Sequence, residues 1–524
     1  MVLHYLNKWL GEFKLIRLLA RYDRIILYGA GLVGGLVGNY LCANGLQRKI
    51  IGYAVSRKDQ NKTSLCGFRI YGIEELKARR NDSLVIVATL PELHREIQKE
   101  LSRLQFQKAL FVTEQFYKDL CTWAMLDFNR QNPVRFRPDA KARVLFMASD
   151  NSRTSGAFLC MAELCGQLKK QGIGAVIVLP SYGTGSSLLD EKRLPYTYIP
   201  AEDWGFELAR EKDLLEKIKF SAALISNYPA YRKICALLKE HQIDLVHCNT
   251  TYTYIGAAAA GHLGVPYVWH LRENMENQGC RIFAGRWAVK LMRKAAAVIA
   301  VSDYIKGLTD FGQPGLVNVI YDPVEADEKY LRKREIFCSE SVQMIIVGAI
   351  APFKGQKELI EACAVLKRKT DMVFHLRIVG KGDKDYVKEL WQLVKSHALE
   401  DSVTFCGISS RVYELYAQSD ISFTCGGREA YGRVTIEAQT AGCLVIGVDS
   451  GGTRELIRDK ETGYLYQGGS AEALAEVIRE AVSRPELSRR IARAGREYAS
   501  RTYTTEKNLR EILDIYEKVL KRSL

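Results

Sequence analysis

Short apolar segments that end in glycine or polar residues recur along this chain, and each is followed by enough residues for a helix. Residues 24–28, 143–147 and 444–448 are examples. Strands that alternate with helices in this way are typical of parallel sheets covered by helices on both faces. The pattern therefore predicts an α/β fold. A length of 524 residues suggests about three domains of ~150 residues each.

Two glutamates eight positions apart, Glu429 and Glu437, stand between an expected strand at residues 420–424 and an apolar strand at 444–448. This context predicts a loop that holds Glu429 and a helix with Glu437 two turns into it. Backbone N–H groups around Gly432 would then lie at the N-terminus of that helix, where a phosphate is stabilised. One carboxylate can accept hydrogen bonds from sugar hydroxyls and the other from a ribose. The segment therefore predicts a site for a sugar nucleotide.

Further motifs surround this pair in a fixed order, at residues 347–355, 403–407, 413–420, 449–455 and 462–463. Together they resemble the nucleotide-binding half of family-4 retaining glycosyltransferases, which have the GT-B fold. The resemblance covers roughly the last three-quarters of the chain and is strongest over residues 344–468. It implies two Rossmann-like domains that face each other, and we expect an additional Rossmann-like α/β domain before them.

The resemblance implies a role for each matching residue. The expected catalytic residues are Lys354, Glu429 and His270. Expected donor-binding residues are Gly156, Gly348, Phe405, Gly432, Arg433, Val434 and Glu437. It implies transfer of a hexose from a UDP-sugar or a GDP-sugar to a glycan or lipid-linked acceptor in polysaccharide biosynthesis. It also implies retention of the anomeric configuration and no required metal or other cofactor.

One departure from the family pattern leaves an alternative open. The family usually has an arginine where Ala349 stands, and that arginine adds positive charge near the leaving phosphate. Arg433 can replace part of this charge. If Arg433 does not replace it, the alternative is a catalytically inactive protein that binds a sugar nucleotide. Lys354, Glu429 and Glu437 are intact and favour the enzyme.

Near the start, residues 24–28, 49–55 and 83–88 predict three strands of a separate Rossmann-type domain. Gly29, Gly31 and Gly34 follow the first strand with the spacing of a dinucleotide-binding turn. An NAD site needs an acidic residue at the end of the second strand, but Ser-Arg-Lys stands at residues 56–58. These residues suit the 2′-phosphate of NADP, which would make the enzyme bifunctional. They also suit a turn that binds no NAD(P), and we favour this second interpretation slightly.

The expected domain boundaries follow from these motifs and from composition. Residues 1–125 form the accessory domain, and residues 126–140 form a linker because the prolines and charges at 129–138 suit neither a helix nor a central strand. Residues 141–325 form the acceptor domain and residues 326–505 the donor domain. Residues 506–524 are expected to form a helix that packs back on the N-terminal half.

The net charge of +15 fits either an anionic partner or a merely soluble basic surface. No nucleic-acid motif is present, so phosphorylated substrates or an anionic membrane surface are the expected partners. Two segments have basic and apolar residues at helical spacing, residues 2–21 and residues 281–294. Each can lie on a membrane or pack on its own domain, and packing is the commoner outcome.

The cysteines and the apolar runs restrict the location of the protein. Thirteen cysteines are scattered without C-x-x-C pairs, so neither a zinc site nor a disulfide framework is predicted. No run approaches the ~20 apolar residues of a membrane span, and the first residues lack the h-region of a signal peptide. We expect a cytoplasmic protein, with peripheral contact at the inner membrane face as an option.

Overall fold

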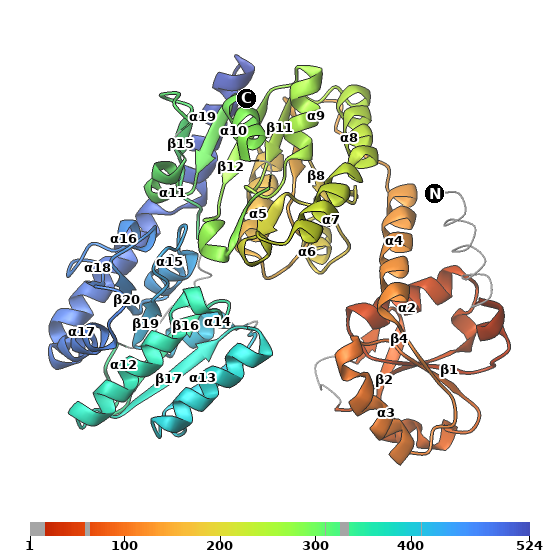
Figure 1. The fold of residues 1–524 in the computed structure, drawn as a ribbon, viewed down its shortest axis with the longest axis horizontal. Coiled ribbons are helices and arrows are strands. Elements are labelled where there is room, and N and C mark those ends of the chain that lie inside the picture. Colours follow the sequence, from red (N-terminus) through yellow and green to blue (C-terminus); the bar gives the residue numbers. More distant parts are fainter. Residues whose placement is uncertain (1–15, 58–62, 284, 310, 325–334, 410) are drawn as a thin grey trace. The chain divides into compact units, whose positions relative to one another are not determined.

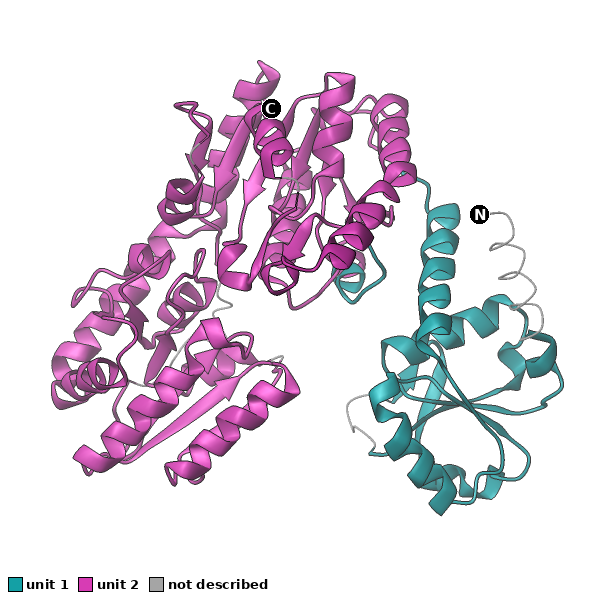
Figure 2. Ribbon diagram, in the orientation of Figure 1, with its two compact units in different colours: residues 1–134, 181–188 teal, residues 135–180, 189–524 magenta. Residues whose placement is uncertain are grey.

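A computed structural model describes residues 16–57, 63–283, 285–309, 311–324, 335–409 and 411–524. The chain divides into two compact units (Figures 1 and 2). The first unit comprises residues 1–134 and 181–188, and the second comprises residues 135–180 and 189–524. Most of the apolar stripe expected in the opening helix, from Val2 to Phe13, lies outside the described residues.

The first unit contains a sheet with strand order β3-β4-β2-β1-β5-β6, parallel except for β3 against β4. Successive residues of a strand point to opposite faces. Ile25 and Leu27 accordingly enter one hydrophobic core and Ile26 and Tyr28 the other. The elements are β1 Ile25–Tyr28, α2 Leu32–Ala43, β2 Ile50–Val55, β3 Ser64–Leu65, β4 Phe68–Gly72, β5 Leu84–Val87, α3 His94–Arg103, β6 Ala109–Phe111 and α4 Glu114–Gln131.

The structure corrects the expected linker. Helix α4 continues through residues 126–131 and ends at Gln131, so the first six residues of the predicted linker are helical. The charged and polar residues there are compatible with a helix, and only Pro133 disfavours its continuation. The division between the two units falls after residue 134. Strands β3 and β4, which lie between the second and third expected strands, were not predicted from the sequence.

The second unit contains two lobes, each built on a parallel sheet (Figure 1). In the first lobe the described strands have the order β15-β14-β12-β11-β7-β8-β9, and β10 and β13 form a separate antiparallel pair. Its elements are β7 Arg143–Met147, α5 Gly156–Lys170, β8 Gly174–Leu179, β9 Tyr196–Tyr198, β10 Gly205–Glu207, α7 Leu214–Ile225, α8 Tyr228–Glu240, β11 Leu245–Cys248, α9 Ile255–Leu263, β12 Tyr267–Leu271, β13 Cys280–Ile282, α10 Gly285–Arg293, β14 Ala297–Ala300, α11 Asp303–Leu308 and β15 Val317–Val319. The division between the units falls within α6 Gly185–Glu191, after Leu188.

The second lobe has the strand order β18-β17-β16-β19-β20-β21, with all neighbouring pairs parallel. Met344 and Ile346 of β16 enter its main core, and Ile345 between them enters the core on the other face. Its elements are β16 Val342–Val347, α12 Gln356–Lys369, β17 Phe374–Val379, α13 Lys384–Ser396, β18 Val403–Gly407, α14 Val412–Ala417, β19 Ile421–Thr424, α15 Arg433–Thr440, β20 Leu444–Val448, α16 Thr453–Leu456, β21 Tyr464–Tyr466, α17 Ala471–Ser483, α18 Pro485–Thr502 and α19 Thr505–Leu520.

Direct contacts join the two lobes. Glu455 of the second lobe accepts hydrogen bonds from the backbone N–H groups of Asp303 and Tyr304 at the start of α11, at 2.8 and 2.6 Å. Ser302 donates to the carbonyl of Ala430 at 2.6 Å. From α19, Tyr516 lies 2.7 Å from Nδ1 of His247 in β11, so the last helix packs against the first lobe. The predicted α/β class with parallel sheets is confirmed.

Candidate active site

The loop that carries Glu429 ends at Gly432, the residue before helix α15. Gly432 has a φ of +94°, a conformation that glycine adopts at little cost. Because α15 begins at Arg433, Glu437 lies little more than one turn into the helix, and the expected two turns are wrong. The N–H groups that follow Gly432 lie at the N-terminus of α15, where an anion is stabilised.

Lys354 and Glu429 come together beside this helix N-terminus. Lys354 ends the short 3-10 helix Pro352–Lys354, and its Nζ lies 2.6 Å from Oε2 of Glu429. Their side chains are 27% and 19% exposed. A Cβ on Gly426 would lie 2.9 Å from the carbonyl oxygen of Phe353. Glycine therefore allows the two loops to approach closely enough for this ion pair.

Both residues line a cleft between the two lobes with a volume of about 750 Å³. Most residues that the sequence predicted for the site also line it: Gly156, Gly348, Lys354, Glu429, Gly432, Arg433, Val434 and Glu437. Two predicted residues, His270 and Phe405, are absent from the lining. The structure thus brings together the motifs around the glutamate pair and places two candidates elsewhere.

Arg433 reaches from the second lobe toward the first. Its Nη1 donates to Sγ of Cys160 on α5 at 2.6 Å, and its Nε lies 3.4 Å from Oε1 of Glu437. Burial raises the pKa of the Cys160 thiol to about 11, against the opposing effect of Arg433, so the thiol is neutral at neutral pH. A Cβ on Gly156 would lie 3.7 Å from Cδ of Arg433. Arg433 is therefore one of several cations in the cleft lining, together with Lys354, Arg153, Arg272 and Lys381.

His270 lies behind the cleft wall and is 1% exposed. Arg272 donates to its Nδ1 at 3.2 Å, so this nitrogen is an acceptor, and Nε2 of His247 at 3.3 Å is a second donor to it. Burial and the Arg272 charge lower the pKa of His270 well below its usual value and that of His247 to about 3. Both rings are neutral. Among the described residues, Nε2 of His270 has no hydrogen-bond partner.

Phe405 is partly buried and packs against the core of the second lobe. Its ring lies 5.7 Å from that of Trp391, centroid to centroid, and it borders the main core of the lobe. The residues that line the cleft at this edge are Ile408, Ser409, Val412 and Tyr413. They follow β18, because the strand ends at Gly407 and the chain reaches the sheet edge only after it.

Glu273 is a further residue of the cleft. It follows β12, lines the cleft, and accepts a hydrogen bond from the backbone N–H of Thr251 at 3.0 Å. Burial raises its pKa to about 7, although the Thr251 bond and Arg272 oppose this. The neighbouring Arg272 forms a buried ion pair with Asp322. A glutamate after a strand end was the available signal, but only the fold shows that it faces the cleft.

In the first unit, the glycines after β1 have a packing role. A Cβ on Gly34 would lie 1.8 Å from the carbonyl oxygen of Gly29, and Gly29 itself has a φ of +114°. Tyr28 at the end of β1, Ser56 after β2 and Glu100 form a hydrogen-bonded cluster, with Ser56 Oγ 2.6 Å from Oε2 of Glu100. These contacts explain Gly29 and Gly34 without a dinucleotide, whose binding here stays a prediction.

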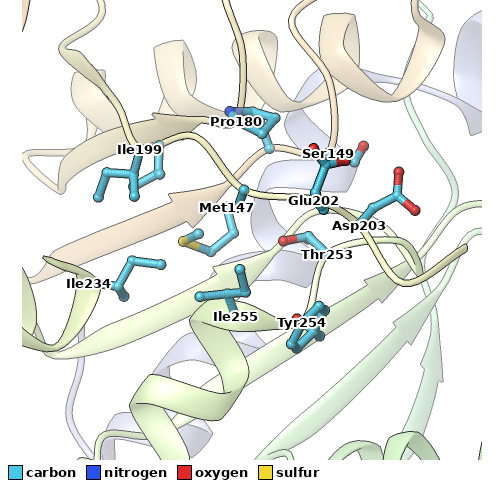
Figure 3. Close-up of a pocket in the computed structure, with 13 residues that line it drawn as sticks. Met147, Ser149, Pro180, Ile199, Glu202, Asp203, Ile234, Thr253, Tyr254 and Ile255 are labelled. Atoms are coloured by element: carbon cyan, nitrogen blue, oxygen red, sulfur yellow. The ribbon is translucent and has the colours of Figure 1, made fainter. Parts of the chain in front are cut away.

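A smaller cavity of about 20 Å³ lies in the first lobe, lined by residues that include Met147, Ile199, Asp203 and Tyr254 (Figure 3). Its apolar side chains come from the sheet and from α8 and α9, and Glu202 and Asp203 lie at one side. This volume holds about one water molecule. The cavity is too small for a sugar, so the interlobe cleft is the candidate site.

Two family models match consecutive parts of the second unit. "Glycosyltransferase Family 4" matches residues 154–328 and "Glycosyl transferases group 1" matches residues 327–498. The chain is a family-4 glycosyltransferase with the GT-B fold. This result confirms the family resemblance and places the matched residues on both sides of the cleft.

Individual relatives agree with this assignment of the glycosyltransferase. The putative glycosyltransferase EpsD of Bacillus subtilis is 27% identical over 311 residues, which cover 55% of this chain and 80% of EpsD. A GDP-mannose-dependent mannosyltransferase of Mycobacterium tuberculosis that acts on phosphatidylinositol monomannoside is 29% identical over 196 residues, 36% of this chain and 50% of that enzyme. The structure of Anabaena HepE with UDP and glucose has a TM-score of 0.58 at 24% identity and covers 72% of this chain and 99% of HepE.

In the described part of the glycosyltransferase, no helix combines the length and the apolar character that a membrane span requires.

Proposed function

We propose that this glycosyltransferase transfers a hexose from a UDP- or GDP-sugar, bound in the interlobe cleft, to a glycan or lipid-linked acceptor in polysaccharide biosynthesis. The reaction retains the anomeric configuration and needs no metal. The observation that carries the proposal is the ion pair of Lys354 with Glu429 beside the N-terminus of α15. A cation, a sugar-binding carboxylate and a phosphate-binding helix end lie together on one wall of the cleft.

The reaction breaks the bond between the anomeric carbon and the diphosphate and forms a bond from that carbon to an acceptor hydroxyl. Negative charge develops on the leaving phosphate oxygen, which takes the proton of the acceptor hydroxyl. Lys354, Arg433 and the N–H groups of α15 stabilise this charge because they are fixed before the reaction. Arg433 supplies the positive charge that the family usually places at Ala349.

Glu429 orients hydroxyls of the donor sugar, and Glu437 binds the ribose. On the first-lobe side, the carboxylate of Glu273, which lines the cleft, accepts a hydrogen bond from the acceptor hydroxyl. His270 keeps a buried Nε2–H without a partner among the described residues. We propose that this N–H binds the transferred sugar when the lobes close on the donor.

Location at the cytoplasmic face of an anionic membrane belongs to the same proposal. It is supported by the net charge of +15 and by the lipid acceptor named for the mycobacterial relative.

Two further measurements test the metal independence and the retention of configuration. EDTA should leave turnover unchanged, and the anomeric proton coupling of the product should match that of the donor.

The experiment that tests this function measures nucleotide release and donor binding with UDP-, GDP-, ADP- and dTDP-sugars. We expect one donor class to bind and to be turned over, and Glu429→Gln to lose turnover. If one donor binds but no turnover occurs with lipid or glycan acceptors, the inactive binding protein is the better description. If no donor binds, the proposal is wrong.

A further inference from the structure

Two buried histidines lie on neighbouring strands of the first lobe. His247 of β11 is paired with Val268 of β12, and His270 follows two residues after Val268. Paired residues of neighbouring strands point to the same face of a sheet, and so do residues two apart in one strand. Both imidazoles therefore lie on one face of the sheet. Neither side chain is more than 1% exposed, and Nε2 of His247 lies 3.3 Å from Nδ1 of His270.

The hydrogen-bond partners determine which nitrogen of each ring carries the proton. Burial lowers the pKa of both rings, so each is neutral and carries one proton. Nη2 of Arg272 lies 3.2 Å from Nδ1 of His270, and because a guanidinium only donates, this Nδ1 is unprotonated. The proton of His270 is therefore on Nε2. His247 faces the same unprotonated Nδ1 with its Nε2, so that nitrogen is the donor and carries the proton of His247.

The last helix supplies the partner of the remaining nitrogen. Nδ1 of His247 is an acceptor because the proton of this ring is on Nε2, and the hydroxyl of Tyr516 in α19 donates to it at 2.7 Å. Burial raises the pKa of Tyr516 well above its usual value, so the hydroxyl keeps its proton. The two hydrogen bonds thus run in one direction, from Tyr516 to His247 to His270, and each polarises the next.

Packing fixes the orientation of this hydrogen-bonded series. The ring of His247 stacks on that of Phe146, with 4.7 Å between the centroids and 20° between the planes. Helix α19 buries Ile512, and Nδ2 of Asn508 in the same helix donates to the carbonyl of Tyr321 at 2.8 Å. The hydroxyl that donates to His247 is therefore held at a fixed position by the packing of the whole helix.

The series ends in a donor without a partner. Nε2 of His270 is buried and has no hydrogen-bond partner among the described residues. A buried N–H without a partner is unfavourable, so the fold keeps a donor ready for an atom of a ligand. A neutral ring suits this role, because an imidazolium would repel the positive charge that develops at the anomeric carbon as its bond to the phosphate breaks.

We propose that His247 and Tyr516 are positioning residues for the transfer reaction, since they hold His270 in the orientation and tautomer in which Nε2–H donates to the transferred sugar. This inference rests on the proposed function, which assigns the transferred sugar to His270. It extends that function to the last helix, because Tyr516 lies 269 positions from His247 in the chain.

Nuclear magnetic resonance of the full chain with 15N- and 13C-labelled histidine tests the tautomers without any donor. The ring shifts distinguish a proton on Nδ1 from a proton on Nε2. The variants His247→Gln and His270→Ala assign the two rings among the eight histidines of the chain. We expect a proton on Nε2 of both rings, and a changed Nδ1 shift of His247 in Tyr516→Phe. A proton on Nδ1 of either ring would overturn the proposal.

A double-mutant cycle tests whether His247 acts through His270. The cycle uses the donor that gives nucleotide release with wild type. We expect His247→Leu to lower kcat by about 10-fold, and Tyr516→Phe by about 3-fold, because each removes one hydrogen bond of the series. His247→Gln should retain most of the activity, since its amide can still donate to Nδ1 of His270. In a His270→Ala background, His247→Leu should cause no further loss.

An equal loss from His247→Leu in both backgrounds would overturn the proposal, as would full turnover by His270→Ala. Melting temperatures establish that the variants are folded, and Tyr516→Phe replaces His247→Leu in the cycle if the leucine variant does not fold. A wild type that turns over no donor would contradict the proposed function. The resonance measurement needs no turnover, so it distinguishes that failure from a failure of the positioning role.

Discussion

The turns after β1 and after β16 are built alike but have different electrostatic surroundings. Gly34 of α2 packs on the carbonyl of Gly29 in the first unit, and Gly380, which follows the neighbouring strand β17, packs on the carbonyl of Gly348 in the second, each with a Cβ distance of 1.8 Å. Around the second turn lie Lys354 and the N-terminus of α15. Around the first lies Glu100, bonded to Tyr28 and Ser56. Glycines allow backbone to approach backbone, and the charges nearby decide whether a phosphate is attracted.

The largest effect is expected where the charge is removed from the second turn. Lys354→Ala should reduce donor turnover by about 100- to 1,000-fold, because a fixed cation facing the leaving phosphate is lost. Initial rates of nucleotide release measure this. Lys357→Ala is the matched control, since Lys357 lies three residues on and does not line the cleft. Comparable losses in both variants would contradict a specific role for Lys354.

Glu273 should make stability depend on pH in a defined window. Its pKa in the folded chain is about 7, above the ordinary value of 4.5, so the fold favours the neutral carboxyl. This contribution is complete below pH of about 4 and is lost as the pH rises through about 7, and it amounts to about 1–3 kcal/mol. Denaturant titrations of wild type and Glu273→Gln across this range measure it. An identical pH dependence in both proteins would refute the assignment.

Adjacent glycines of α2 offer a test of the first turn. Gly34→Ala should destabilise the first unit by about 1–3 kcal/mol, because the new Cβ would overlap the carbonyl of Gly29. Gly35→Ala is the control, since its Cβ would meet the nearest atom at 3.8 Å, and alanine in a helix is more stable than glycine by about 0.5–1 kcal/mol. Hydrogen exchange in β1 and β2 reports both changes. The two substitutions should change the free energy of unfolding in opposite directions, and equal destabilisation by both would contradict the packing role of Gly34.

The smallest effect is expected from dinucleotides. NADPH and NADH should leave the melting temperature of the full chain unchanged. The Glu100 carboxylate at the ends of β1 and β2 repels the 2′-phosphate of NADPH. Its Oε2 already accepts hydrogen bonds from Tyr28 and Ser56, so it is not available to the ribose hydroxyl of NADH. A rise with NADPH that Arg57→Ala abolishes would instead support the bifunctional enzyme.

The motifs around Glu429 could be predicted from the sequence because their function depends on local order. Gly432, Arg433 and Glu437 are close in the chain, and a helix that begins after a glycine fixes their spacing. Lys354 was also predictable, since it follows a strand end in a recognisable loop. His270 and Phe405 were predicted for the site by the same reasoning, but neither lines the cleft.

The sequence by itself determined the α/β class, which depends on periodicity, and the glycosyltransferase family, which depends on motifs that resemble those of the family and occur in the same order. The tertiary structure decided what depends on side-chain direction and on contacts between distant segments. It buried His270 outside the cleft lining, with its Nδ1 bonded to Arg272 and His247. It brought Arg433 against Cys160, 273 positions away. It also brought Tyr516 against His247, because the last helix packs on the first lobe.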